Sequence, residues 1–211
     1  MQYVLFDVET TGLGKFDEVI QFCCFTFEDQ FKVCKSMHDF YCMTTRPISP
    51  KALAVHNITA EKLRKLSDEK FFEEYFYELK KNFSKDCMFI YYSFSGFDMR
   101  LVNQTLQNQN LPAFNFGKKT DSLRPKTGIY NYDLQSAISS YLGKRRACRL
   151  EDAVRLVSQD NVDTVKRRYL NFNKAITKTC DSDIQNDQMF HNARFDVFCM
   201  WYLLSETSAR L

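Results

Sequence analysis

The stretch YVLFDVETTG, residues 3–12, decides how the rest of the chain is interpreted. It opens with four apolar residues, a pattern typical of a buried strand, and Asp7 follows at once. Side chains two residues apart on a strand share a face, so Asp7 and Glu9 point to the same side of a sheet. Neighbouring carboxylates repel each other and lose hydration on burial, and a divalent cation removes that cost. The stretch therefore predicts a metal-binding strand, with two acids at an exposed strand end as the alternative.

Two later stretches carry further candidate ligands, and each also has a plain structural interpretation. Asp98 follows the apolar run Cys87–Tyr92, at a strand end where α/β sheets place their chemistry, although an Asp that begins a helix is often only a cap. His191 and Asp196 precede and begin an apolar C-terminal helix, so both can reach one cleft. A histidine near a helix start can equally be a polar cap.

Hydrophobic patterning predicts an α/β domain. Apolar and aromatic runs predict strands over Tyr3–Phe6, Glu18–Phe27, Lys32–Met43 and Cys87–Tyr92, with a strand or loop at 120–123. Helical spacing predicts a short helix after Thr59, a longer one capped by Ser67 with a core-facing aromatic stripe, and helices over Phe97–Gln109, Tyr132–Leu142, Leu150–Ser158 and Asn192–Ser205. We expect a mixed sheet flanked by helices in one domain over residues 1–211, with a loop at 46–50 and a polar insertion or arm at about 159–188.

Composition sets mild limits. The net charge of +3 permits a polyanionic partner without requiring one. Eight cysteines without a Cys-x-x-Cys pair favour buried, reduced thiols over disulfides or a zinc site. No secretory signal pattern and no apolar run of about 18 residues is found, so we expect a cytoplasmic protein without membrane contact.

Together, these motifs resemble the DnaQ-like exonucleases of the DEDDh group over nearly the full chain. Asp-x-Glu-Thr-Thr-Gly, a mid-chain Phe-Asp and a late His-x-x-x-x-Asp occur in the order and spacing of that family. Supporting matches are the Pro-rich loop at 47–50 that leads into Val-His-Asn-Ile-Thr at 55–59, the Asp-Ser-Leu segment at 121–123 and Leu-Glu-Asp-Ala at 150–153.

The resemblance implies an RNase H-like fold, with a mixed five-stranded sheet flanked by helices. It also implies a 3′→5′ exonuclease that releases 5′-mononucleotides from single-stranded ends of DNA or RNA. Asp7, Glu9, Asp98 and Asp196 would hold two Mg²⁺ or Mn²⁺ ions, hard cations that suit oxygen ligands. His191 would act as the general base in a two-metal hydrolysis.

The same resemblance assigns substrate contacts. Backbone groups of Thr10 and Thr11 would meet the terminal nucleotide, and Leu13 would be either a wedge against the last base or a buried turn residue. Apart from the resemblance, the basic run Lys166, Arg167 and Arg168, together with Lys144-Arg145-Arg146 and Arg149, is either a sequence-blind phosphate-binding region or a solvated helix face.

The chain also departs from the family pattern. The second motif usually reads His-Asn-x-x-Phe-Asp, and here Ser93 and Phe94 replace the His and Asn. Asn57 replaces the Gly that usually follows His56, and we interpret His56 and His38 as structural. The alternatives to an active exonuclease are a catalytically silent nucleic-acid-binding module and a proofreading subunit of a DNA polymerase. The short tail after Ser205 disfavours the second alternative, and a homodimer stays open.

Overall fold

A six-stranded mixed sheet forms the centre of the computed structural model, which describes residues 1–28, 31–83, 86–125, 127–159, 161–177 and 190–208. The strand order is β3-β2-β1-β4-β6-β5. The first three strands form an antiparallel meander, and β4, β6 and β5 continue the sheet in parallel from β1. The strands are β1 (Gln2–Thr10), β2 (Val19–Glu28), β3 (Val33–Tyr41), β4 (Cys87–Tyr91), β5 (Lys118–Lys119) and β6 (Ile129–Asp133).

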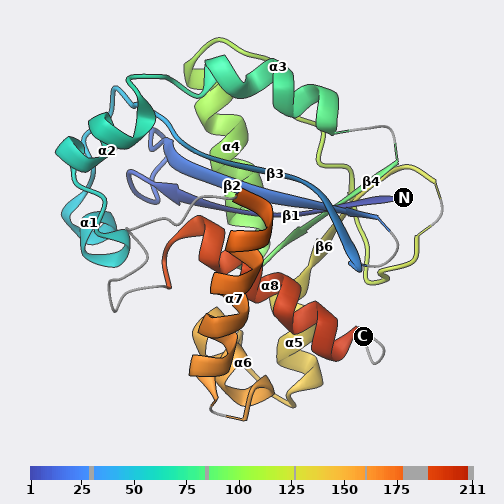
Figure 1. The fold of residues 1–211 in the computed structure, drawn as a ribbon. Helices are drawn as coiled ribbons and strands as arrows, with labels where there is room; N and C mark the ends of the chain where they lie inside the picture. The colour runs from blue at the N-terminus through green and yellow to red at the C-terminus, as the bar shows by residue number, and fades with distance from the viewer. Residues whose placement is uncertain (29–30, 84–85, 126, 160, 178–189, 209–211) are drawn as a thin grey trace.

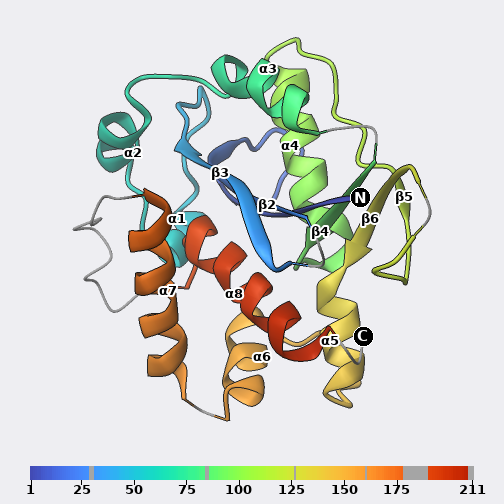
Figure 2. The same cartoon turned by 45° about the vertical axis from the view of Figure 1, so that its right-hand side comes forward.

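Helices cover both faces of this sheet. Figure 1 shows α3 and α4 above the sheet, and α5 to α8 below it. Figure 2 shows α6 lying between α5 and α7, with α8 passing under the sheet. The helices are α1 (Pro50–His56), α2 (Ala60–Ser67), α3 (Glu73–Asn82), α4 (Phe97–Asn108), α5 (Leu134–Tyr141), α6 (Leu150–Val157), α7 (Val162–Thr177) and α8 (Ala193–Thr207), with a 3₁₀ turn, η1 (Phe94–Gly96), before α4.

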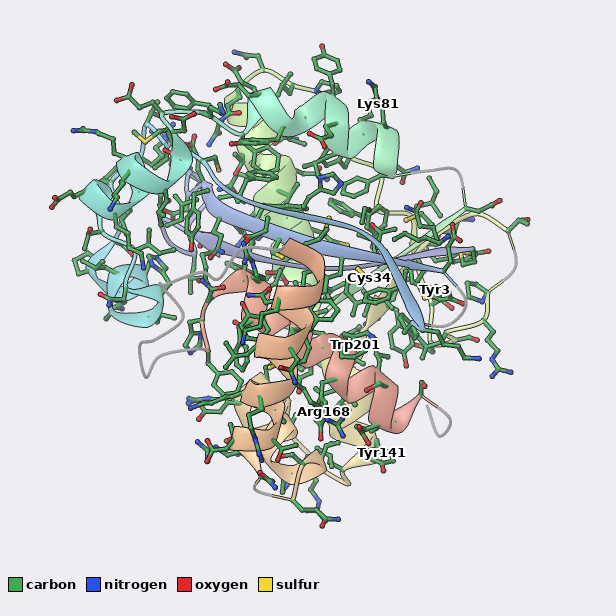
Figure 3. All side chains as sticks on the ribbon, in the orientation of Figure 1. Tyr3, Cys34, Lys81, Tyr141, Arg168 and Trp201 are labelled. Carbon is green, nitrogen blue, oxygen red and sulfur yellow. The ribbon has the colours of Figure 1, made fainter. Side chains whose placement is uncertain are left out.

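The alternation of side chains along β1 creates two apolar cores. Tyr3 and Leu5 join the core against α8, whereas Val4 and Phe6 join the core beneath α3 and α4. Phe6 sits among three aromatic rings, with centroid distances of 6.2 Å to Phe22 and Phe89 and 5.6 Å to Phe116. The abundant phenylalanines of the sequence therefore fill the layers between sheet and helices. Trp201 and Cys34, both labelled in Figure 3, pack against the core on the α8 side, and the Trp201 indole donates to the Phe31 carbonyl at 3.0 Å.

The predicted mixed sheet flanked by helices is confirmed, with one strand more than expected. The residues of β6 include the start of the helix predicted over 132–142, and that helix begins only at Leu134. The prediction was wrong there because β6 pairs with both β4 and β5, and the Asp133 side chain caps α5 by accepting from Ser136 N at 2.9 Å. Residues 120–123 form a loop after the short edge strand β5.

Helix boundaries near residues 46–73 also differ from the prediction. The stretch predicted as a loop leads into α1, which Ser49 caps by accepting from Ala52 N at 3.2 Å. Thr59 caps α2 as predicted. Ser67 does not cap a helix: it ends α2, since the next two residues adopt left-handed backbone conformations and α3 starts at Glu73. The aromatic stripe does face the core, as expected, with Phe72, Phe76 and Leu79 buried.

The segment predicted as a polar insertion or arm is a helix over its first part. Val165 and Tyr169 of α7 are buried in the core that α8 shares, and residues 178–189 lie outside the described residues. Seven cysteines are free thiols, six of them buried, whereas Cys180 is outside the described part. Within the described ranges, no helix combines the length and apolarity needed to cross a membrane.

We predict that Phe6→Ala lowers the free energy of unfolding by about 3–5 kcal/mol, because it empties a site enclosed by three aromatic rings. Urea unfolding followed by circular dichroism measures the change. Tyr77→Ala is the control: Tyr77 is a largely exposed aromatic residue of α3, and its loss should cost no more than about 0.5 kcal/mol. Equal losses in both variants would contradict this description of the core.

Candidate active site

Strand β1 presents the first two carboxylates on the side of the sheet that faces α8. Asp7 and Glu9 follow the parity of Tyr3 and Leu5, which belong to the α8 core. Glu9 is 8% exposed. The register with β2 shifts between Glu9 and Thr10, so the strand bends immediately after the second carboxylate. The prediction that both acids share one face is confirmed.

The third carboxylate, Asp196, lies on the first turn of α8 and is 7% exposed. A polar network fixes the start of this helix against β2 and β3. Arg194 forms a largely buried ion pair with Asp39, whose second oxygen accepts from the Gln21 amide at 3.2 Å. The Gln21 amide oxygen accepts in turn from Ala193 N at 3.3 Å. This network brings the helix start to the strand that carries Asp7 and Glu9.

The fourth carboxylate, Asp98, begins α4 just beyond the end of β4 and is 3% exposed. The hydroxyl of Ser93 donates to it. Ser93 occupies the position of the histidine in the family motif, so the substituted motif still contacts the carboxylate. The turn between them needs left-handed backbone at Ser95 and Gly96, and at Gly96 a β-carbon would also lie 2.5 Å from the Met99 methyl group.

Among the described residues, no lysine or arginine is among the groups that shift the pKa values of the four carboxylates. Burial and then the charges of Asp98, Asp196 and Glu9 raise the pKa of Asp7 well above its usual range. Burial raises the pKa of Asp98 to about 6 and that of Asp196 to about 8. Burial and then the charges of Asp196 and Asp98 raise the pKa of Glu9.

This donor set fits divalent cations. Asp7, Glu9 and Asp196 each place one oxygen so that all three lie within 4.8 Å of one another. The Oδ1 atom of Asp196 is buried without a hydrogen-bond partner among the described residues, although its Oδ2 accepts from His191 N at 3.1 Å. A buried oxygen without a donor is costly, and a hard cation with oxygen ligands would satisfy it. Asp98 interacts electrostatically with Asp7 and Glu9, which places all four predicted ligands in one cluster.

His191 is exposed and stands two residues before the start of α8. Its backbone is left-handed, with φ 64°, and its amide bonds to Asp196. Partial desolvation lowers the pKa of the imidazole, Glu151 raises it and Arg149 lowers it. The net shift is downward, so the imidazole is neutral near pH 7 and able to accept a proton. The predicted histidine and carboxylates are therefore neighbours.

A cavity of about 450 Å³ opens beside Glu9. Its walls are largely apolar, with Leu13 75% exposed at the rim; the lining residues are Val8, Glu9, Thr10, Gly12, Leu13, Ser49, Lys51, Ala52, Val55, His56 and Phe97. The exposure of Leu13 excludes the alternative of a buried turn residue. Lys51, Val55 and Phe97 were not predicted as site residues, because only the folding of α1 and α4 brings them to this rim.

Of the two predicted threonines, only Thr10 lines this cavity. Thr11 is fully buried. Its amide donates to the Glu18 carbonyl, its carbonyl accepts from Ser49 N, and its hydroxyl donates to the Asp17 carboxylate. His56 holds the Thr10 end of β1: its Nδ1 accepts from Ile58 N at 3.0 Å, which leaves Nε2–H to donate to the Thr10 carbonyl at 3.2 Å. The structural role predicted for His56 is consistent with these bonds.

The predicted basic run on α7 lies apart from this cavity. Arg168 pairs with Glu206 at 2.8 Å and stacks over the Tyr202 ring, and Arg167 donates to Thr164 at 3.2 Å. Figure 3 shows Arg168 on α7, beside α8. The segments that resembled later family motifs lie elsewhere: residues 121–123 are in the loop after β5, whereas 150–153 begin α6 and bring Glu151 near His191.

Comparison with solved structures gives matches to exonuclease I. The zinc-bound complex of E. coli exonuclease I with single-stranded DNA superimposes with a TM-score of 0.67 at 16% identity, covering 99% of this chain and 41% of that one. E. coli exonuclease I in complex with a dA16 oligonucleotide also gives a TM-score of 0.67, at 15% identity and the same coverage. These likenesses show a shared RNase H-like fold, and this chain spans about two fifths of the length of those proteins. No curated protein sequence matches the chain.

The sequence profile of the exonuclease family RNase_T matches residues 4–127. That range covers β1 to β5 and contains three of the four clustered carboxylates, Asp7, Glu9 and Asp98. Asp196 and His191 lie beyond it, and the fold brings them back to the same place. On this match and on the structural likeness, the chain belongs to the RNase_T exonuclease family, in the DnaQ-like, DEDDh-type group.

Proposed function

We propose that this protein is a metal-dependent 3′→5′ exonuclease that removes 5′-mononucleotides from the ends of single-stranded nucleic acid. The observation that carries the proposal is the convergence of a neutral histidine with four carboxylates whose pKa values no lysine or arginine of the described residues shifts. A structural cluster would pair its acids with cations or expose them to water. Here the cost of leaving them unpaired in the apo protein is understandable only if a ligand relieves it.

Two Mg²⁺ or Mn²⁺ ions, held by Asp7, Glu9, Asp98 and Asp196, would supply activation of water and neutralisation of charge on the phosphate. His191 accepts the proton of the attacking water, a role that its lowered pKa permits. The water oxygen bonds to phosphorus and the bond from phosphorus to the 3′-oxygen of the preceding nucleotide breaks. That oxygen takes up a proton from solvent and becomes the new 3′-hydroxyl, and a nucleoside 5′-monophosphate leaves. The backbone amide of His191 donates a hydrogen bond to the side chain of Asp196. This bond fixes the position of the general base relative to the metal ligand.

The cavity beside Glu9 suits the terminal nucleotide. A base can lie against the apolar side chains of Leu13, Val55 and Phe97, while Lys51 offers a positive charge at the rim. The loop that carries Leu13 is held in place, because Arg100 donates to the Leu13 carbonyl at 3.2 Å and Gly14 N donates to Asp17 at 2.6 Å. Leu13 therefore serves as a preformed wedge against the last base.

Single-stranded DNA is the substrate to test first, since the similar structures are complexes of exonuclease I with single-stranded DNA. RNA is the second candidate. The active protein is proposed to work as a free trimming enzyme; association with a polymerase and a homodimer would be secondary properties, and the cytoplasm is its expected location.

We predict that the protein shortens 5′-labelled single-stranded oligonucleotides in a ladder from the 3′ end in Mg²⁺ or Mn²⁺. EDTA and Asp7→Asn should abolish the ladder, because they remove the cations or one of their central ligands. His191→Ala should slow cleavage by about 10²–10⁴-fold, the usual worth of a general base. Product analysis on denaturing gels, with DNA and RNA in parallel, measures all three effects.

His38→Ala is a matched histidine control, since His38 contacts Glu78 of α3 on the other face of the sheet. It should keep the wild-type rate. If wild-type protein binds single strands tightly but cleaves none of them in either metal, the silent binding module becomes the better description. A ladder that starts from the 5′ end would contradict the proposed direction.

A second prediction concerns stability in the absence of metal. The pKa values of Asp98 and Asp196 in the folded protein are raised above the unfolded value. Their contribution to the free energy of unfolding is therefore favourable below about pH 4. It is lost as the pH rises through about 6 for Asp98 and about 8 for Asp196. Asp196→Asn should therefore raise the melting temperature in EDTA, and the gain should grow between about pH 5 and pH 8.5. Differential scanning fluorimetry measures it.

The exposed acid Glu61 of α2 supplies the control, because Glu61→Gln should leave the pH dependence unchanged. Added Mn²⁺ should stabilise wild-type protein and not Asp196→Asn. A gain for Asp196→Asn that is the same at every pH would mean that carboxylate repulsion does not limit the metal-free fold.

A further inference from the structure

A second cavity, of about 620 Å³, lies at the loop between α5 and α6 and carries a concentration of positive charge. Its lining residues are Lys144, Arg145, Arg146, Ala147, Cys148, Asp152, Arg155 and Leu156. Arg155 is held by Glu151 at 2.8 Å. The other three cations are exposed, and within the described ranges their side chains form no hydrogen bond or ion pair. Asp152 is the one carboxylate of the lining.

The backbone of this loop is fixed, so the three cations project from a defined support. The Cys148 carbonyl accepts from the Tyr92 hydroxyl at 3.0 Å and from the Gln135 amide at 3.2 Å, and Cys148 N donates to the Ser139 hydroxyl at 2.9 Å. Lys144 N donates to the Ser139 carbonyl at 2.8 Å. Anchoring of this kind lowers the conformational entropy that is lost when a ligand binds.

The same anchors connect the cavity to the catalytic edge of the sheet. Tyr92 directly precedes Ser93, the residue that donates to Asp98. At the other end of the loop, Arg149 and Glu151 lie close enough to His191 for their charges to act on its imidazole. These links place the cavity near the carboxylate cluster, and its lining shares no residue with the apolar cavity that Leu13 and Val55 border.

Clustered, unpaired arginines and a lysine in a concave surface attract anions, and arginine matches the geometry of phosphate oxygens. We propose that the cavity at residues 144–146 binds phosphates of the substrate strand on the 5′ side of the nucleotide that is being removed. The inference rests on the proposed function, because it assumes that the strand reaches the carboxylate cluster. Exposed Leu156 offers an apolar floor next to the cations, on which a sugar or base can rest.

This assignment moves phosphate binding from α7 to the α5–α6 loop. Both basic runs are near the catalytic helix in the sequence, so the sequence alone does not distinguish them as phosphate-binding sites. In the structure, Arg168 and Arg167 already have protein partners, whereas Lys144, Arg145 and Arg146 have none in the described part. The two runs can therefore be separated by substitution.

The test measures the affinity of the protein for a single-stranded oligonucleotide of about 20 nucleotides at several salt concentrations. The measurement is made in EDTA, so that the strand is not cleaved. Lys144→Gln, Arg145→Gln and Arg146→Gln together should weaken binding at least tenfold. They should make the slope of log affinity against log salt less negative by roughly 0.7 for each phosphate that the variant no longer neutralises. Hydrolysis of a dinucleotide in Mg²⁺ should keep its rate, because so short a substrate does not reach the cavity.

Two comparison variants complete the experiment, one that removes three positive charges and one that removes two. Lys65→Gln, Lys80→Gln and Lys81→Gln remove the same charge from α2 and α3; Figure 3 shows Lys81 at the far side of the sheet from Arg168. These substitutions should leave the slope unchanged. Lys166→Gln with Arg167→Gln tests the α7 run. The proposal is overturned if the loop variant keeps the wild-type slope, or if the α7 or distant lysine variant changes it as much.

The readouts also separate this proposal from the proposed function. A wild-type protein that cleaves nothing but whose affinity depends on residues 144–146 would refute the nuclease and support the phosphate site. A loop variant that loses dinucleotide hydrolysis in proportion to its loss of affinity would refute the site, because its effect would then lie in the catalytic centre.

Discussion

Repulsion among four clustered carboxylates, three of them buried and Asp7 partly buried, is the constraint on which the rest of the structure depends. Burial raises the pKa of each of these acids, and the charge of another carboxylate raises the pKa of Asp7, Glu9 and Asp196 further. Folding must hold these acids together although no lysine or arginine of the described residues is among the groups that shift their pKa values. A protein can keep such an arrangement only if the surrounding packing is strong enough to tolerate it, and it is useful only if divalent cations complete it.

The architecture supplies that packing. Strand β1 lies inside the sheet, between β2 and β4, so Asp7 and Glu9 extend from one of its best-supported elements. Asp196 arrives on α8, whose start is fixed by the Arg194–Asp39 pair, and Asp98 arrives from the opposite layer around the end of β4. The two cavities have separate linings, one largely apolar and one basic. We propose that a strand with its last base in the first and its phosphates in the second passes the carboxylates.

Sequence reasoning succeeded where the signal was local. The period of β1 predicts the shared face of Asp7 and Glu9, and the apolar run of α8 predicts the place of Asp196. It failed where the secondary structure depends on residues far away in the sequence. Part of β6 was predicted as helix, because its pairing with β4 and β5 cannot be seen in the local sequence. Ser67 has the residue type of a helix cap, although a left-handed turn follows it. The contact of Ser93 with Asp98 and the lining of both cavities likewise depend on folded geometry, which one sequence cannot show.

Calorimetric titration of Mn²⁺ into metal-free protein at about pH 7 tests the central claim most directly. The account predicts binding with net proton release, because Asp196 has a pKa of about 8 and must lose its proton to become a ligand. Repeating the titration in buffers of different ionisation enthalpy counts those protons. Wild-type protein should bind two ions, and Asp196→Asn should lose most of both the affinity and the proton release. Equal binding by Asp196→Asn, or binding without proton release, would show that the buried carboxylate cluster is not the metal site.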